Sequence, residues 1–449
     1  MPTQTGHFPS PTAEEVQTAA ARARSRARPP TRQTAPNIMH PTLHVGGSGV
    51  TATVFPPKLP RTQSSATGFY RSSRFDWLSM IGSIRVPTPE GGSVVLCGDS
   101  QLPPHDPNQP SYGVGFAAEF GCGLRGTVCP RADQGLDMMS AKGGRTKKPP
   151  ALPSYITNGV FGYGDAGPGG EFLKLGVGIL RKPTKSQDGE AGYNASFPYT
   201  VVEPPQSQVR FLNCTRAHRS DPSPCASYNK WDAVEMQSTV RLRNWGYRIR
   251  RRIRPCGEPD GKLIAGSLCV DVRLVNLGLD ALTTPYVVGH LFNVQGAPSV
   301  GPGYSVSFAL RGAQQYKDVP DSRPLEAVAV LQLRDDGKTS EVKFAREVPE
   351  YERAMASFRV RDQAWKGGFA IAMPTDGGRS VVVTHSMEFA PPVAARSSRD
   401  PVAQHNWYGF NVHATKRSVA PRPYSLLTLP AGAMLQWTHK YDFRWRNDF

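Results

Sequence analysis

Strict alternation of apolar and polar residues most constrains what this chain of 449 residues can fold into. The stretch "GAMLQWTHKYDF" places on one face of an extended strand Ala433, Leu435, Trp437, His439, Tyr441 and Phe443. The stretches "SVVVTHSMEF", "SLCVDVRLVNLG" and "EFLKLGVGIL" alternate in the same way. Because successive side chains of a strand point to opposite faces, these stretches predict β-strands that are buried on one side.

Turn-forming residues separate the alternating stretches. The chain has 44 Gly and 42 Pro, which together exceed the roughly 12% of average usage. No strong helical pattern follows residue 66, and no repeat period indicates a propeller. The sequence therefore predicts an all-β fold of large antiparallel sheets, with long loops at 131–154 and 391–404.

The first part of the chain differs in composition, and we expect two regions: a disordered basic arm at 1–65 and one domain at 66–449. The segment "TAEEVQTAAARARSRAR" opens with a T-x-x-E capping box and predicts one short helix. An Arg- and Ala-rich leader resembles an organellar transit peptide, and a solvated tail is the alternative. The expected location is the cytoplasm, or an organelle if residues 1–60 act as a transit peptide. No apolar run approaches the roughly 20 residues that span a bilayer, so no membrane partner is expected.

The net charge of +17 favours anionic partners, among them nucleic acid, acidic lipid and acidic or phosphorylated sugars. The densest basic stretch, "VRLRNWGYRIRRRIR", predicts a strand with one face formed by Arg248, Arg250, Arg252 and Arg254. Guanidinium groups pair with phosphate or carboxylate, although a solvated, aggregation-resistant face explains the same pattern. Aromatic residues are missing from this face, so nucleic acid is not an expected partner.

Cofactor and metal motifs are weak. The seven cysteines are odd in number and include no C-x-x-C, which predicts buried thiols in a reducing compartment rather than zinc ligands or disulfides. "GYGDAG", at 162–167, matches G-x-G-x-x-G, but a strand follows it where a nucleotide site needs a helix. His405 and His413 are expected to be surface loop residues. We therefore expect no cofactor and no metal.

The stretch "TTPYVVGHLFNVQG", at 283–296, predicts a buried strand that carries His290 at its centre. By itself, a histidine in an apolar strand is most often a core residue with satisfied hydrogen bonds. A catalytic acid is the alternative, since histidine titrates near neutral pH.

Several segments, read in chain order, resemble the galactose mutarotase-like (aldose 1-epimerase-like) superfamily, in particular an uncharacterised aldose-epimerase-type branch. The segments are "GFYRSSRFDWLSMIGSI", "HDP" with "GFAAEFG", "FGYGDAGPGGEFLKLGVGILRKP", "VRLVNLGLDALTTPYVVGHLFNV" and "PRPYSLLTLPAGAMLQWTHKYDF". The resemblance covers most of residues 66–446. It implies a β-supersandwich with a sugar site in a cleft on one sheet.

The resemblance also implies an isomerase that interconverts the anomers of an aldose or sugar phosphate by opening the sugar ring. This reaction needs an acid and a base tuned near the operating pH. The matching positions give His290 as the acid and Glu119 as a catalytic carboxylate. The residues implied to bind the sugar are Arg74, Asp76, His105, Trp77 and Phe292.

One position departs from the family pattern. The closing segment of the family carries a glutamate before a proline as the general base, whereas "APRPY" places Arg422 there. Arginine cannot accept a proton at neutral pH. Two alternatives follow: Glu119, Glu171 or another carboxylate serves as the base, or the protein binds carbohydrate without catalysis.

Overall fold

The computed structural model divides the chain into two compact units, Met1–Met39 and His40–Phe449. Every described residue belongs to the second unit. The structure describes residues 42–44, 50–55, 69–70, 80–96, 116–120, 159–184, 199–203, 206–212, 230–231, 233–257, 263–290, 292–294, 297, 299–310, 314–315, 323–333, 339–349, 354–360, 364–375, 378–391 and 402–447.

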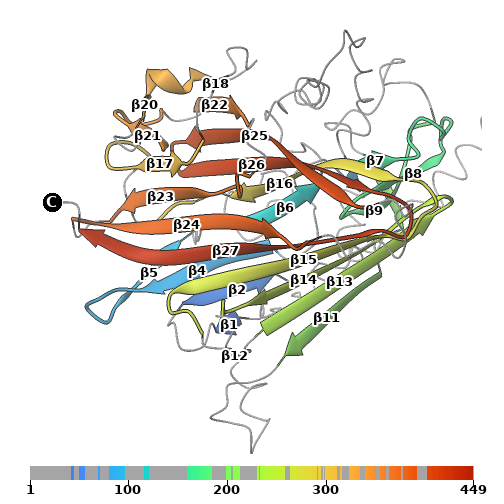
Figure 1. The fold of residues 1–449 in the computed structure, drawn as a ribbon, viewed down its shortest axis with the longest axis horizontal. Coiled ribbons are helices and arrows are strands. Elements are labelled where there is room, and N and C mark those ends of the chain that lie inside the picture. The colour runs from blue at the N-terminus through green and yellow to red at the C-terminus, as the bar shows by residue number, and fades with distance from the viewer. Residues whose placement is uncertain are drawn as a thin grey trace, which may run out of the picture. The chain divides into compact units, whose positions relative to one another are not determined.

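The described residues form three sheets, and apart from the pairs β1–β12 and β19–β22 the strands are antiparallel (Figure 1). A 12-stranded sheet contains, in spatial order, β12 (Lys230–Trp231), β1 (Thr42–His44), β2 (Thr51–Phe55), β4 (Met80–Pro87), β6 (Phe116–Phe120), β16 (Leu282–His290), β26 (Ser418–Leu429), β25 (Gln404–Thr415), β22 (Ala354–Arg359) and β18 (Gln314–Gln315), with β5 (Ser93–Leu96) beside β4 and β19 (Arg323–Pro324) beside β22.

A 10-stranded sheet contains β11 (Gln206–Leu212), β13 (Ala233–Leu242), β14 (Trp245–Arg254), β15 (Ser267–Asn276), β27 (Met434–Asn447), β24 (Arg379–Phe389), β23 (Phe369–Pro374), β17 (Ser305–Phe308), β21 (Ser340–Phe344) and β20 (Ala329–Leu333). A 5-stranded sheet contains β3 (Phe69–Tyr70), β10 (Tyr199–Glu203), β9 (Gly178–Arg181), β8 (Glu171–Lys174) and β7 (Val160–Phe161). One 3-10 helix, Leu325–Ala327, is described, and no helix within the described ranges is long and apolar enough to cross a membrane.

The main hydrophobic core lies between the 12-stranded and 10-stranded sheets, whose inward-facing residues form one contiguous cluster. The alternating stretches supply it as predicted: β27 buries Leu435, Trp437, His439, Tyr441 and Phe443 and leaves the intervening residues more exposed. Burial of apolar area at about 25 cal/mol per Å² is the main force that holds two such sheets together. The predicted all-β architecture of large antiparallel sheets is confirmed.

The sheet begins earlier in the chain than the sequence indicated. β2 pairs with β4, and Val50 and Ala52 are fully buried in the main core. These residues fall within 1–65, the range expected to form a disordered arm. The alternation in "TATVF" is only five residues long and borders a proline-rich stretch, so composition concealed it.

The 5-stranded sheet packs against the β13–β14 end of the 10-stranded sheet. Phe161 and Trp245 meet with ring centroids 5.2 Å apart, and the Tyr247 hydroxyl accepts a hydrogen bond from the Gly176 amide at 3.1 Å. "GYGDAG" forms the turn between β7 and β8. β8 follows that turn, which confirms the prediction that a strand stands where a G-x-G-x-x-G nucleotide site needs a helix.

The "VNLG" segment that contributed to the family resemblance has a structural role. The Asn276 side-chain amide donates to the carbonyls of Asp280, Leu429 and Pro430, at 2.8 to 3.1 Å. A Cβ at Gly278 would lie 2.2 Å from the Asn244 carbonyl oxygen, so only glycine fits this close approach of two backbones. Together they set how β15 turns into β16.

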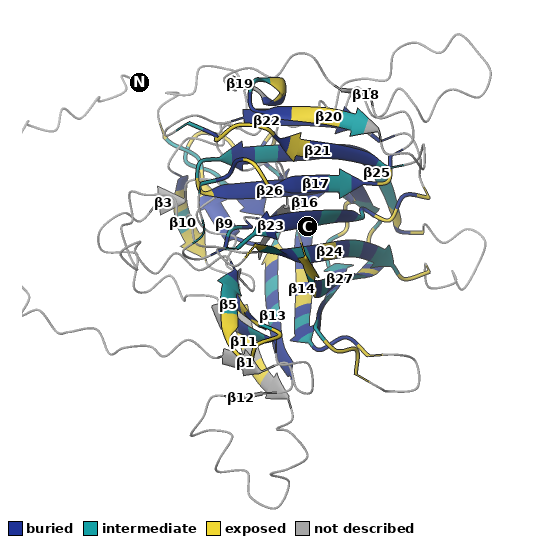
Figure 2. Ribbon diagram, turned by 90° about the vertical axis from the view of Figure 1, so that its left-hand side faces the viewer, coloured by how far each residue is buried: buried dark blue, intermediate teal, exposed yellow. Residues whose placement is uncertain are grey.

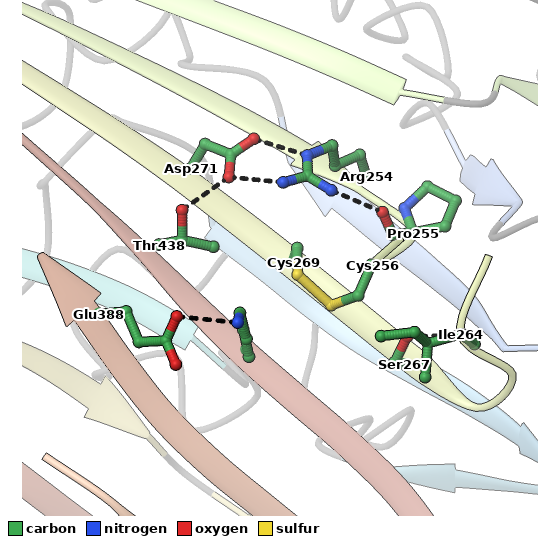
Figure 3. Close-up of a disulfide and its surroundings, with 10 residues drawn as sticks. Arg254, Pro255, Cys256, Ile264, Ser267, Cys269, Asp271, Glu388 and Thr438 are labelled. Carbon is green, nitrogen blue, oxygen red and sulfur yellow. Dashed lines mark hydrogen bonds and ion pairs between the residues drawn. A yellow bond between two sulfur atoms is a disulfide. The ribbon is translucent and has the colours of Figure 1, made fainter. Parts of the chain in front are cut away.

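A disulfide joins Cys256, just after β14, to Cys269 on β15 (Figure 3). The prediction of unpaired thiols is wrong for this pair. The two Cα atoms lie 5.0 Å apart, within the range that a disulfide needs. The sequence could not show this proximity, because it arises from the pairing register of β14 and β15 rather than from cysteine spacing.

We predict that replacing both cysteines by serine lowers the free energy of unfolding by about 3 kcal/mol, because a closed loop of this length restricts the unfolded chain by about that amount. Urea denaturation under non-reducing conditions measures the change. The single variants Cys256→Ser and Cys269→Ser should match the double variant, since each removes the same bond. Losses that add up across the two single variants would instead mean that each sulfur acts only through packing.

Candidate functional site

His290 stands at the end of β16 with its side chain in the main core. The ring is fully buried and stacks on Phe292 at a centroid distance of 5.5 Å. The rings of Phe369 and Tyr441 make edge-to-face contacts with it. The residues around His290 are therefore those of a packed interior.

Both ring nitrogens of His290 are engaged. Nδ1 lies 2.8 Å from the carbonyl oxygen of Pro421, which can only accept, so Nδ1 carries the proton. Nε2 lies 3.0 Å from the Tyr441 hydroxyl and accepts its hydrogen. The second bond crosses from β16 in the 12-stranded sheet to β27 in the 10-stranded sheet.

Two further buried histidines continue the arrangement. His385 on β24 donates from Nδ1 to the Gly367 carbonyl at 3.1 Å, which leaves its Nε2 to accept from Nδ1 of His439 at 3.1 Å. Nε2 of His439 then accepts from the Tyr286 hydroxyl at 2.8 Å and from the Trp437 indole N–H at 3.2 Å. We call His290, His385, His439, Tyr286, Tyr441 and Trp437 the histidine network.

The hydrogen bonds assign one tautomer to all three rings: protonated on Nδ1, accepting on Nε2, and neutral. Burial lowers the pKa of His290 and of His439 well below the usual value, and the neighbouring His385 lowers both further. Burial lowers the pKa of His385 to about 3, against a weaker opposing effect of its hydrogen bond to Gly367. Burial likewise raises the pKa of Tyr286 to about 12. The network is therefore uncharged at neutral pH.

The structure describes three of the seven residues that the sequence assigned to a sugar site. His290 and Phe292 lie together in the core, and Glu119 lies on β6 with its backbone in register with Val287. Arg74, Asp76, Trp77 and His105 lie outside the described residues. The roles assigned to these residues stay predictions, but His290 in this conformation has no ring nitrogen left for a sugar oxygen.

The sequence did not single out His385 and His439, although the signal was present. Each occupies the apolar face of an alternating stretch, as His290 does. If those strands face one core, the three histidines are expected to lie close together. His405 and His413 are strand residues of β25, half-buried, and not the loop residues that were expected. No group of three or more His, Cys, Asp or Glu in the described part of the chain could hold a metal ion.

Arg422 lies on the opposite face of the 12-stranded sheet from His290. Tyr424 and Leu426, which alternate with Pro423 and Ser425 on β26, form a separate cluster with Val287 and Tyr408. Arg422 alternates in the same phase as Tyr424, whereas Pro421 is the residue whose carbonyl meets His290. The position at which the resemblance expected a base and the position at which it expected an acid therefore do not face a common cleft.

The outer face, meaning the side of the 12-stranded sheet that carries Arg422 and Tyr424, holds a row of buried polar side chains. In the strand register, Ser357 on β22 stands opposite Asn411 on β25, and Asn411 stands opposite Arg422 on β26. Their exposed fractions are 3%, 0% and 3% respectively. We call Ser357, Asn411 and Arg422 the polar row; β26 is buried on both faces along nearly all its length (Figure 2).

Two atoms of the polar row have unmet hydrogen-bonding capacity. Ser357 Oγ and Asn411 Oδ1 are buried, and neither makes a hydrogen bond to any residue that the structure describes. The Asn411 amide nitrogen does donate, to the Tyr424 hydroxyl at 3.1 Å. Leaving a buried polar group unsatisfied costs about 1–3 kcal/mol, which is why such atoms are rare in folded proteins.

The fold is thus a pair of large antiparallel sheets with a neutral polar network inside and a polar row outside. No protein-family model matches the chain, and no curated protein matches its sequence. Among solved structures it is similar to the Slr1438 protein from Synechocystis sp. PCC 6803, at 10% identity and a TM-score of 0.36, over 89% of this chain and 92% of that one.

Two further similar structures bear the names of the superfamily that the sequence segments resemble. One is the GalM/aldose epimerase homologue from C. elegans, at 8% identity and a TM-score of 0.34, over 90% of this chain and 98% of that one. The other is a candidate aldose 1-epimerase from Escherichia coli K12, at 13% identity and a TM-score of 0.29, over 62% and 79%. At such values the likeness bears on no residue role and on no activity.

We predict that acidification destabilises the protein through the histidine network. Each folded-state pKa is lowered, so the stabilisation is complete above the usual pKa of about 6.5 and is lost as the pH falls from there towards the folded value, about 3 for His385. Between about pH 7.5 and about pH 5.5 each histidine should remove about 1.4 kcal/mol from the free energy of unfolding, or about 4 kcal/mol for the three. Urea denaturation at both pH values measures the drop.

The variant His385→Asn provides the control. Whatever its absolute stability, its pH-dependent drop should be smaller than that of the wild type by about 1.4 kcal/mol. An unchanged drop would contradict the neutral, buried state of this ring.

Proposed function

We propose that the protein binds a carbohydrate, an aldose or a sugar phosphate, on the outer face of the 12-stranded sheet, at the polar row. The observation that carries the proposal is the buried pair Ser357 Oγ and Asn411 Oδ1, which lack hydrogen-bond partners among the described residues. Sugar hydroxyls both donate and accept, so one ligand class satisfies a hydroxyl and an amide oxygen together.

The geometry of the row supports a ligand of this size. Three neighbouring strands carry it, so its ends are about 10 Å apart. Arg422 at one end adds a positive charge to the row, which favours an anionic sugar over a neutral one. Tyr408 and Tyr424 lie beside the row with ring centroids 5.9 Å apart, buried in a cluster with Val287 and Leu426.

Binding without turnover is the form of this function that the geometry supports best. Ring opening through His290 would require an acid that reaches the sugar, and the histidine network uses both nitrogens of that ring. The expected base position holds Arg422, which cannot accept a proton.

Anomer interconversion is the second candidate, and one observation favours it. Glu119 on β6 is in register with Val287, which in turn is in register with Tyr424 beside the polar row. A glutamate at this register position is a candidate base, with an acid other than His290.

The test combines calorimetry with an NMR measurement of anomer exchange, over a panel of neutral aldoses, sugar phosphates and uronic acids. We expect at least one sugar to bind, and the double variant Ser357→Ala/Asn411→Leu to weaken that binding by about tenfold or more, because it removes two hydrogen bonds to the ligand. No accelerated exchange is expected.

His290→Gln is the matched control, since it alters the core face of the same sheet. It should lower the free energy of unfolding and leave the affinity unchanged. A loss of affinity in His290→Gln alone would refute the outer-face site. Accelerated exchange that disappears in Glu119→Gln would establish the isomerase instead, and no binding by any sugar would end the carbohydrate proposal.

A further inference from the structure

The outward side of β11, β14 and β15 in the 10-stranded sheet carries six arginines. Along β14 they alternate with buried core residues, as the sequence predicted, and Figure 2 shows this alternation of buried and exposed residues along the strand. We call this surface the arginine face; it comprises Arg210, Arg248, Arg250, Arg252, Arg254 and Arg273.

Only part of this charge is neutralised. Arg250 pairs with Glu235, and Arg254 holds Asp271 through two bonds of 2.7 and 3.0 Å (Figure 3). Arg248 and Arg252 make no ion pair with any described residue, and Nε of Arg252 is buried without a hydrogen-bond partner there. The face therefore presents six cations against two carboxylates, which stand in register on either side of Arg252 and form ion pairs with Arg250 and Arg254.

The arginines destabilise the sheet when no anion is bound to them. Arg250 and Arg273 stand directly opposite each other across β14 and β15. Like charges in that position destabilise a sheet. A solvated surface does not require such a pair, whereas an anionic partner converts it into a stabilising one.

The neighbouring residues are amides rather than aromatics. Gln208 and Gln237 are in register with Arg250, and Gln436 is in register with Arg273. Amide groups hydrogen-bond hydroxyls as donors and acceptors. The arginines along one strand lie about 6.7 Å apart, so they suit a chain with regularly repeated anionic groups.

These features favour a polysaccharide over a nucleic acid as the ligand of the arginine face. Single-stranded nucleic acid is held largely by aromatic stacking, and the arginine face carries arginine and glutamine instead. A duplex is read by an element that enters a groove, and a broad sheet face does not. Carboxylate or sulfate groups with flanking hydroxyls match guanidinium and amide side chains together.

The disulfide is an independent observation that agrees with this choice. Cys269 pairs in register with Arg254, so the bond fixes the end of β14 and β15 next to the arginines (Figure 3). Disulfides persist in oxidising environments such as the periplasm and the cell exterior. Acidic polysaccharides are abundant there, and nucleic acids are not.

We propose that the arginine face binds an acidic polysaccharide, a chain of uronic acid or sulfated sugar units. Its anionic groups pair with Arg248, Arg252 and Arg273, and its hydroxyls bond the adjacent glutamines. This surface is distinct from the polar row, and neither site depends on the other.

The test measures binding of polygalacturonate oligosaccharides and of heparin oligosaccharides to the full chain by calorimetry. We expect at least one of them to bind, with an affinity that falls as salt rises. The double variant Arg248→Gln/Arg273→Gln should weaken that binding by about tenfold, since two charge pairs are lost.

The matched control is Arg346→Gln/Arg444→Gln, which removes the same charge from two exposed positions outside the arginine face. Arg444 is roughly 27 Å further along β27 than the residue opposite Arg273. The control should bind within about twofold of the wild type, well under the tenfold loss expected of the test variant.

Three results would overturn the proposal: equal weakening in both double variants, tighter binding of a single-stranded or duplex oligonucleotide, or no binding of either polysaccharide. Ser357→Ala/Asn411→Leu should leave polysaccharide binding unchanged, so failure here is distinguishable from failure of the sugar site.

Discussion

The two large sheets are joined by hydrogen bonds as well as by apolar contact, and the arrangement of the interior depends on those bonds. Tyr286 and His290, both on β16, reach His439 and Tyr441 on β27. A hydrophobic interface tolerates sliding, but a donor paired with one acceptor does not. If one partner of such a hydrogen bond moves away, a buried polar atom is left unsatisfied, which costs about 1–3 kcal/mol. The network therefore specifies how the sheets align.

The same strands carry two chemical environments on their two faces. On β26, Pro421 meets His290 inside the core, and Arg422, one residue later, belongs to the polar row outside. A shift of one residue would exchange these environments, which is why strand register matters so much here. The sugar site that we propose therefore lies on the face of the sheet opposite to His290.

The sequence predicted local features well because alternation determines which side chains share a face. It placed His439 and Tyr441 together, and it separated Arg248, Arg250, Arg252 and Arg254 from the core residues of β14, although it did not indicate that Arg251 is buried among those core residues. It could not predict which faces meet. His290 and Tyr441 are 151 residues apart, and only the order of strands in two sheets brings them together. The disulfide and the polar row escaped prediction for the same reason, since each depends on cross-strand register.

The positions of β26 and β27 in the sheets have a consequence for biosynthesis. β26 lies between β16 and β25, and β27 lies between β15 and β24, so each joins two parts of its sheet. Neither sheet can be completed before residues 418–447 have left the ribosome. Until then the nascent chain exposes unpaired strand edges, a state that favours aggregation and engages chaperones. Both large sheets are therefore expected to form late in folding, with few stable intermediates before β26 and β27 pair with their neighbours.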